Sequence, residues 1–217
     1  ISYFKEYMNQ KNGKNSLGLG LCFEDLDNPI DLFKNWFKKA EETEINDPNA
    51  VALGTADKKN QPSVRMVLLK GLSDRGFVFY TNFNSKKGSD LKINQQASMC
   101  FHWKSLRRQV RVIGKVEQVT EKEADKYFNS RPYKNRVSAW ASSQSEKLES
   151  RDVFLSKIKE FEKKYPDQNK VPRPAHWSGW RILPQEVEFW LDGEGRIHER
   201  LNYVNTSSGW KKEILYP

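Results

Sequence analysis

Three side chains near the C-terminus have the chemistry to bind an anion together. The segment FWLDGEGRIHER, residues 189–200, places Arg196, His198 and Arg200 at alternate positions. Successive side chains of an extended strand point to opposite faces, so a strand here would put all three on one face. Such a row of potential cations suits phosphate recognition. A solvated edge strand, where basic residues discourage pairing with other strands, explains the same pattern equally well.

Other segments place polar donors within or just after apolar strands. VRMVLLKG contains Arg65 and Lys70, YTNFNSKKG ends in hydroxyl groups before Lys86 and Lys87, and RRQVRV alternates Gln109 with valines. Each is weak alone, because a half-buried strand can carry an arginine with its charged end in water, and paired lysines before a glycine are typical of a solvated turn. Their recurrence beside aromatic residues favours a site for a phosphate and a flat conjugated ring.

The formal net charge of +9 fits either a nucleic-acid partner or small anionic ligands. The basic residues are spread through patterned segments and form no tail, which weakens the nucleic-acid interpretation. The sequence contains neither a zinc-finger spacing nor the glycine-aromatic pattern of an RNA-recognition strand. We therefore expect no nucleic-acid partner, with a nucleic-acid-binding barrel kept as an alternative.

The sequence predicts a protein without membrane spans. Its longest stretch free of Lys, Arg, Asp and Glu runs from Ile93 to Trp103, well short of the roughly 20 residues that a membrane-spanning helix needs. Residues 1–15 lack the apolar run of a secretory signal, so a cytoplasmic location is expected. Cys22 and Cys100 have no CxxC spacing and are too few for a structural zinc site, so no metal is expected.

The chain is expected to form one domain over residues 28–217, preceded by a mobile arm over residues 1–27, which are polar and lack periodicity. The segment NPIDLFKNWFKKAEE predicts a helix with Asn28 as N-cap and Pro29 at its first position. TEKE at residues 120–123 is a capping box for a second helix. RVSAWAS and RDVFLSKIKEFEKKY predict two more.

The remaining patterned segments predict strands. NAVALGTAD, PSVRMVLLKG, GFVFYTNF, ASMCFHW and RRQVRVIGKVEQV are joined by loops too short for helical crossovers, which favours an antiparallel meander or barrel. GWRILP, VEFWL, GRIHERLNYV and GWKKEILYP predict further strands near the C-terminus. The expected fold is therefore α+β, a β-barrel with flanking helices.

These segments resemble the pyridoxine (pyridoxamine) 5′-phosphate oxidase family. RMVLLKG, FYTNFNSKKG, RRQVRVIGKVE, YFNSRP, AWASSQS and VEFWLDGEGRIHER occur in the family's order, followed by a terminal strand with Trp and Lys. The resemblance extends from the NPIDLF helix to the last strand. It implies an antiparallel split β-barrel, a homodimer, and FMN bound at two sites that both subunits build.

The resemblance also implies roles for individual residues. Arg65, Lys86 and Lys87 would meet the FMN phosphate or its surroundings, and Trp190 and Arg200 would complete the flavin pocket, from the other subunit. The remaining positions that match FMN-binding residues of the family are Lys70, Tyr80, Thr81, Gln109, Gln144 and Ser145. Arginine offers phosphate a fork of donors and lysine a point charge, which suits these positions.

The resemblance places the substrate phosphate at Lys70, Tyr127 and Arg131, and the pyridine ring at Arg196 and His198. The substrate would be a small phosphorylated pyridine, oxidised at its 4′ carbon by hydride transfer to the flavin. Dioxygen would reoxidise the flavin and yield hydrogen peroxide, in a step of vitamin B6 metabolism. The protein would supply orientation and electrostatics, while the cofactor performs the redox chemistry.

The chain departs from the family at several positions. Asn135 stands where the family usually has a serine near the substrate phosphate; an amide can still donate to phosphate, so weakened binding is expected. Ser138 replaces a glycine in the helix that contains VSAW. The N-terminal segment lacks the arginine-rich stretch that often covers the active site. A non-catalytic or differently specific flavin-binding split barrel remains the alternative to the oxidase.

Overall fold

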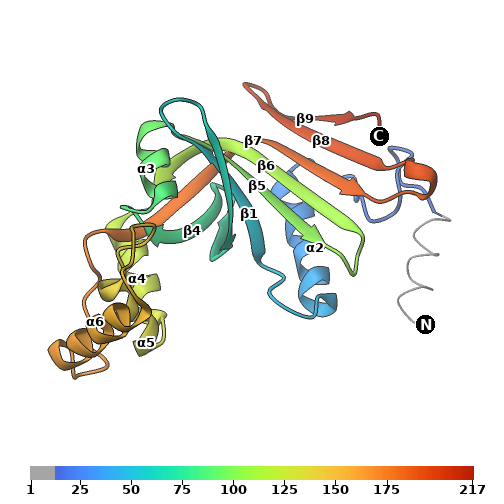
Figure 1. Cartoon of the computed structure of the whole chain (residues 1–217). Helices are drawn as coiled ribbons and strands as arrows, with labels where there is room; N and C mark the ends of the chain where they lie inside the picture. Colours follow the sequence, from blue (N-terminus) through green and yellow to red (C-terminus); the bar gives the residue numbers. More distant parts are fainter. Residues whose placement is uncertain (1–12) are drawn as a thin grey trace.

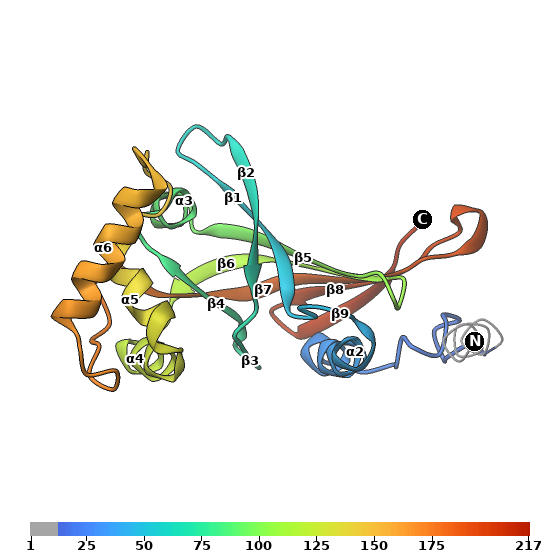
Figure 2. The same cartoon turned by 60° about the horizontal axis from the view of Figure 1, so that its bottom comes forward.

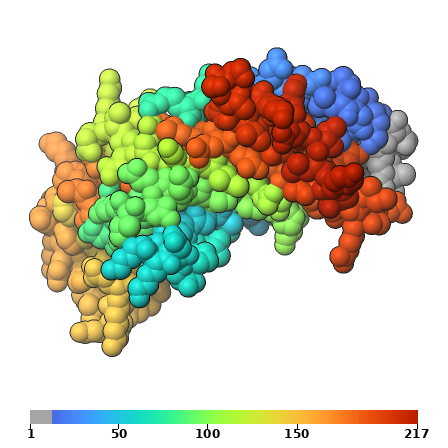
Figure 3. All heavy atoms as spheres, turned by 90° about the horizontal axis from the view of Figure 1, so that it is seen from above, coloured from blue at the N-terminus to red at the C-terminus, as the bar shows by residue number. Residues whose placement is uncertain are grey.

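A long, curved antiparallel sheet runs through the molecule, with helices packed around it (Figure 1). The computed structural model describes residues 13–217. Helices α4, α5 and α6 gather at one end of the sheet, and strands β8 and β9 form the other end (Figures 1 and 2). In the view from above, β1 and β2 lie between these two ends (Figure 3). This arrangement is the α+β fold that the sequence predicts.

The described residues contribute nine strands to the sheet. Their bounds are β1 Ala50–Ala56, β2 Pro62–Leu68, β3 Gly71–Ser73, β4 Gly76–Asn82, β5 Gln96–Trp103, β6 Arg108–Gln118, β7 Trp177–Leu191, β8 Glu199–Thr206 and β9 Gly209–Ile214. The order is β2-β1-β5-β6-β7-β4-β3, with β8 paired to β7 and β9 to β8. The first part of β7 pairs with β4, its last part pairs with β8, and β6 pairs with both parts.

Five α-helices surround this sheet in the part of the chain that the structure describes. They are α2 Pro29–Thr43, α3 Lys86–Ile93, α4 Glu121–Ser130, α5 Tyr133–Ala141 and α6 Arg151–Lys164. The two caps that the sequence predicts are confirmed. Asn28 accepts a hydrogen bond from the amide of Ile30 at 2.9 Å. Thr120 and Glu123 form the reciprocal capping box of α4.

Helix α2 packs its apolar stripe onto the main core of the sheet. Phe33 is fully buried, and its ring centroid lies 4.9 Å from that of Phe77 and 5.0 Å from that of Phe101. Trp36 is also buried and meets Phe189 at 5.1 Å. Aromatic side chains from α2, β4, β5 and β7 therefore fill one continuous core, which fixes the strands that carry the site.

The structure corrects three of the expected elements. Lys86 and Lys87 open α3, capped by Ser85, where the sequence suggested a solvated turn. GWRILP and VEFWL form the single strand β7. Pro184 does not interrupt it, because it lies opposite Gly114 at a register shift, where a backbone N–H is not needed for pairing. Strand β8 begins only at Glu199, since residues 194–196 form a short 3₁₀ turn.

The expected mobile arm is wrong for residues 13–27. Phe23 is fully buried and Leu19 nearly so, both in the main core. The indole of Trp36 donates to the carbonyl of Cys22 at 2.7 Å, and the hydroxyl of Tyr203 donates to the carbonyl of Leu26 at 2.8 Å. This segment packs as part of the domain despite its polar composition. Residues 1–12 lie outside the described residues.

Truncation of Phe33 tests the core. We expect Phe33→Ala to lower the free energy of unfolding by about 3–5 kcal/mol, because it leaves a cavity among several aromatic rings. Urea unfolding followed by tryptophan fluorescence measures the change. Lys38→Ala on the exposed side of the same helix is the control and should stay within about 0.5 kcal/mol. Equal effects of the two substitutions would contradict this description of the core.

Candidate functional site

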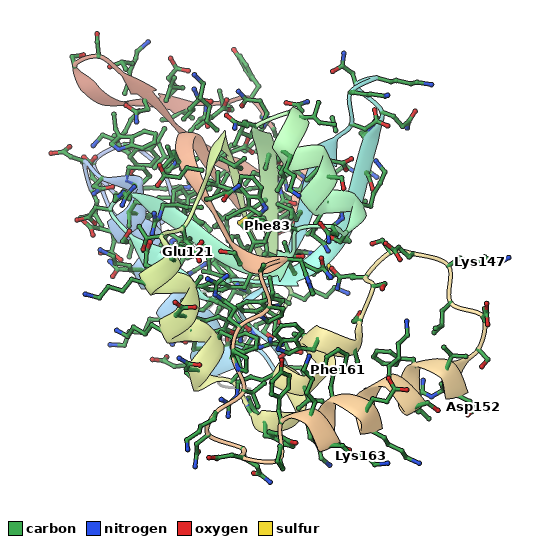
Figure 4. All side chains as sticks on the ribbon, turned by 90° about the vertical axis from the view of Figure 1, so that its left-hand side faces the viewer. Phe83, Glu121, Lys147, Asp152, Phe161 and Lys163 are labelled. Carbon is green, nitrogen blue, oxygen red and sulfur yellow. The ribbon has the colours of Figure 1, made fainter. Side chains whose placement is uncertain are left out.

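A cavity of about 620 Å³ opens where β2, β4 and the start of β7 meet helices α4 and α5. Of the residues proposed from the sequence, it is lined by Arg65, Lys70, Tyr80, Thr81, Lys87, Tyr127, Arg131, Asn135 and Gln144. Side chains from strands, helices and the loop after α5 therefore converge on one space. Helix α6, on which Asp152 and Lys163 are labelled in Figure 4, adds a further wall through Phe154.

Lys87 is the buried cation of this cavity. Its ammonium donates to the hydroxyl of Thr81 at 3.1 Å, to the hydroxyl of Ser85 at 3.2 Å, and to Oε1 of Gln144 at 2.8 Å. Burial, helped by repulsion from Arg65, lowers the pKa of Lys87 to about 8. These three partners are neutral, so its charge remains available to an anion.

Arg65 is held in place by the strand and helix around it. It donates to the hydroxyl of Thr55 at 2.7 Å and to the hydroxyl of Ser63 at 2.7 Å. Its Nη2 lies 3.9 Å from the buried carboxylate of Asp90, which also accepts from Thr55 at 2.8 Å and from Lys86 at 2.7 Å. Asp90 therefore anchors two of the predicted cations, and Lys86 itself does not line the cavity.

The opposite wall is a stack of aromatic rings capped by an arginine. Tyr80 stacks on Tyr127 with 4.1 Å between centroids, and on Trp177 with 5.4 Å. The guanidinium of Arg131 lies 4.6 Å above the ring of Trp177. Burial lowers the pKa of Arg131, although arginine stays charged in proteins. Its Nη1 is buried and has no hydrogen-bond partner among the described residues.

Seven of the predicted residues do not line the cavity: Lys86, Gln109, Ser145, Trp190, Arg196, His198 and Arg200. Lys86 is held by Asp90 at the start of α3, and Ser145 directly follows the cavity residue Gln144. The other five form a second group at the opposite end of the sheet. Gln109 and Trp190 face each other across β6 and β7, and the ring of His198 lies 4.7 Å from that of Trp190. The turn that carries residues 194–198 is at the opposite end from α4, α5 and α6 (Figure 1).

The prediction that Arg196, His198 and Arg200 share one face of a strand is wrong. Arg196 is exposed and has a left-handed backbone, with φ of 66°, and so does not continue the strand. Nδ1 of His198 lies 3.1 Å from both the amide nitrogen of Gly193 and Oδ1 of Asp192, which orients the ring from the turn. Only Arg200 belongs to β8.

Arg200 is held by a buried carboxylate. Its Nε and Nη2 donate to the two oxygens of Glu188 at 2.9 and 3.0 Å, and Arg111 pairs with the same carboxylate. Burial alone would raise the pKa of Glu188, but hydrogen bonds from Arg200 and Arg111 outweigh it and lower that pKa. Glu188 thus fixes the orientation of Arg200 across the sheet.

Some residues that shape the cavity were not predicted from the sequence, because they lie outside the motifs that resemble the family. Asp90 was detectable as the partner of Lys86 one helical turn away, had α3 been predicted. Trp177 and Arg173 lie in or beside the proline-containing loop before β7, where no periodic pattern points to them. Their roles follow from contacts between segments distant in sequence.

Comparison with known proteins identifies the family. Residues 37–165 match the family model described as "Pyridoxamine 5′-phosphate oxidase", and residues 177–217 match "Pyridoxine 5′-phosphate oxidase C-terminal dimerisation region". The chain belongs to the pyridoxamine 5′-phosphate oxidase family. Four residues of the second group lie within the match to this dimerisation region: Trp190, Arg196, His198 and Arg200.

Curated members of the family are similar over nearly the whole chain. A pyridoxine/pyridoxamine 5′-phosphate oxidase of Pelagibacter ubique (strain HTCC1062) is 58% identical over 95% of this chain and 100% of its own. The protein of the same name from Sinorhizobium fredii (strain NBRC 101917 / NGR234) is 52% identical over 90% of this chain and 95% of its own.

Solved structures share the architecture. PhzG from Burkholderia lata 383, in complex with tetrahydrophenazine-1-carboxylic acid, superposes with a TM-score of 0.85, at 29% identity over 94% of this chain and 100% of that chain. A pyridoxamine 5′-phosphate oxidase-related, FMN-binding protein from Nostoc punctiforme PCC 73102 gives 0.68, at 16% identity over 85% of this chain and 97% of that chain. The second likeness concerns the fold alone.

Residues 13–217 contain no cluster of three or more His, Cys, Asp or Glu side chains arranged to hold a metal ion. None of the helices in that range is both long and apolar enough to span a bilayer.

The lowered pKa of Lys87 predicts a pH dependence of anion binding. Lys87 is charged below pH of about 8 and loses its charge above it, so affinity for a phosphate monoester should fall as pH rises beyond 8. A bound dianion raises the pKa of Lys87, so the complex keeps the proton that the free protein has lost. The affinity should therefore fall by up to about tenfold per pH unit above pH 8. Calorimetric titration between about pH 7 and 9.5 measures it. Lys87→Arg should remove the dependence, since guanidinium stays charged; an unchanged slope would exclude Lys87 as its source.

Proposed function

We propose that this protein oxidises pyridoxine 5′-phosphate and pyridoxamine 5′-phosphate to pyridoxal 5′-phosphate, with FMN as cofactor and dioxygen as electron acceptor. The observation that carries the substrate assignment is the buried Nη1 of Arg131, which has no partner among the described residues. A buried donor without a partner costs free energy, and a substrate phosphate oxygen would satisfy it. Tyr127 and Lys70, on the same cavity, complete the proposed phosphate site.

The other cationic wall of the cavity fits the phosphate of FMN. The ammonium of Lys87 donates to neutral partners, and Arg65 is held in position by Thr55 and Ser63. Thr81 adds a hydroxyl on the same wall. Two distinct donor groups thus face one cavity, as two phosphate-bearing ligands require.

The overall reactions balance with dioxygen. Pyridoxine phosphate loses two hydrogens from its 4′ carbon and oxygen, giving the aldehyde and hydrogen peroxide. Pyridoxamine phosphate reacts with dioxygen and water to give the aldehyde, ammonia and hydrogen peroxide. When bound, FMN supplies the ring that accepts the hydride. The protein's own contribution is to hold both phosphates, so that the two rings are oriented for transfer.

The second group of residues reaches this cavity only from another chain. We propose that Trp190, His198 and Arg200 complete the site from a second copy, with Arg196 and His198 against the pyridine ring. Gln109, Gln144 and Ser145 remain proposed flavin contacts. The match of residues 177–217 to a dimerisation region supports a homodimer in which two such sites form.

The rival function is a flavin-binding split barrel that does not act on a phosphorylated pyridine. Such a protein has no use for a half-buried arginine on the side of the cavity away from the flavin phosphate. Arg131 on Trp177 and the adjacent Tyr127 therefore favour the oxidase.

Anaerobic mixing tests the reaction directly. The purified protein, loaded with FMN, is mixed with pyridoxamine 5′-phosphate without dioxygen, and the visible flavin absorbance is followed. We expect the absorbance to bleach, and to return with formation of hydrogen peroxide when air is admitted. A protein that binds FMN but is not reduced by either phosphate ester would support the rival function.

Removal of the unpartnered guanidinium tests the substrate site. Arg131→Ala should raise KM for pyridoxine phosphate about 10- to 150-fold, the loss expected from a charge-assisted contact worth roughly 1.5–3 kcal/mol. The Kd for FMN should stay near the wild-type value. Arg151→Ala, at an exposed residue outside the cavity lining, is the matched control. Weaker FMN binding with an unchanged KM would mean that the two phosphate sites are exchanged.

A further inference from the structure

Arg173 lies in the loop before β7 with its side chain 9% exposed. Its Nε donates to Asp125 at 2.7 Å, its Nη2 donates to Glu121, and its Nη1 donates to the carbonyl of Trp177 at 2.8 Å. All three nitrogens of the guanidinium therefore have acceptors, and these acceptors come from two different elements. A planar fork of donors suits such a set, and a lysine ammonium cannot reproduce it.

The two elements that Arg173 joins carry the proposed substrate-phosphate side of the cavity. Glu121 and Asp125 lie one turn apart on α4, and Tyr127 and Arg131 follow at the end of the same helix. Both side chains lie beside Trp177, and Tyr127 also stacks on Tyr80 with 4.1 Å between centroids. The ring of Tyr127 is stacked 6.1 Å from that of Trp177, and the guanidinium of Arg131 lies 4.6 Å above it.

The loop around Arg173 is stiff. Pro172 and Pro174 flank it, and each proline fixes its own backbone φ angle. The amide of Trp177 donates to the carbonyl of Pro174 at 3.0 Å, which closes the turn into β7. Arg173 thus projects from a constrained backbone. It pairs with Glu121 and Asp125 on the exposed side of α4.

We propose that Arg173 is a positioning residue for the substrate phosphate: it sets the rotation of α4 relative to Trp177 and so the places of Tyr127 and Arg131. Arg173 itself does not line the cavity. The inference rests on the proposed function, because it takes Tyr127 and Arg131 as the residues that meet the substrate phosphate. A small displacement of such residues is costly to affinity, since the phosphate contacts are directional.

Arg173→Lys tests the inference because it keeps the charge and removes the fork. We expect KM for pyridoxine phosphate to rise roughly tenfold, while kcat and the Kd for FMN stay within about twofold. Binding of pyridoxal 5′-phosphate should weaken by a similar factor, and binding of pyridoxal, which lacks the phosphate, should not change. A merely structural role would lower the melting temperature without this selectivity for phosphate.

Asp125→Asn reaches the same contact from the exposed side of α4, where loss of folding is not expected. It should weaken pyridoxal phosphate binding in the same direction, and the double variant should show less than the sum of the two effects, because both remove one interaction. Arg75→Lys is the control: Arg75 pairs with Glu117 at 2.5 Å, is largely exposed, and does not line the cavity. It should leave binding unchanged.

The wild-type and variant results separate the two hypotheses. A wild-type protein that neither oxidises the phosphate esters nor prefers pyridoxal phosphate to pyridoxal overturns the proposed function, and this inference with it. A wild-type protein that does both, with Arg173→Lys and Asp125→Asn unchanged in phosphate selectivity, overturns the inference alone. Additive effects in the double variant would also overturn it, since Arg173 and Asp125 would then act separately.

Discussion

The length of strand β7 is the constraint on which the rest of the structure depends. It runs for 15 residues, with Trp177 at its first position and Trp190 near its last. At about 3.3 Å per residue these two positions are separated by roughly 40 Å in an extended strand. The cavity lies at the first end, and the turn with Arg196 and His198 follows the other. A single rigid sheet cannot bring both groups to one ligand, which is why a site that uses both needs two chains.

The cations in and beside the cavity fall into two kinds, those paired with a carboxylate and those without one. Arg65 and Lys86 share the buried carboxylate of Asp90, so their positions are fixed before any ligand binds. Lys87 and Arg131 are different. Burial lowers the pKa of both groups, and no carboxylate among the described residues forms a salt bridge with either. Cations of that kind are stabilised by an anionic ligand more than by the protein. The two lie on separate walls, which fits one phosphate on each.

The sequence predicted those features whose causes are local. Asn28 before Pro29 and the Thr120 capping box specify helix starts by themselves, and period-two patterns located most strands. Helix α3 was not predicted, because a helix of eight residues with little apolar content is barely stable in isolation. In the folded chain the hydrogen bond between Thr55 and Asp90 stabilises it. The alternation at residues 196–200 suggested a strand, but left-handed Gly195 and Arg196 turn the chain instead. The cavity residues came from family resemblance, whereas Arg173 required the folded arrangement.

Complementation between two impaired chains is the most direct test of a site shared by two copies. Arg131→Ala and His198→Ala chains are purified separately, unfolded together and refolded as a mixture. If each site takes Arg131 from one chain and His198 from the other, a mixed dimer has one intact site. Because half of the dimers are mixed, we expect the mixture to show about a quarter of the wild-type kcat/KM, measured at substrate concentrations far below KM, and either variant alone to show much less. A mixture that forms mixed dimers but stays at the level of the single variants would show that each chain builds its site unaided.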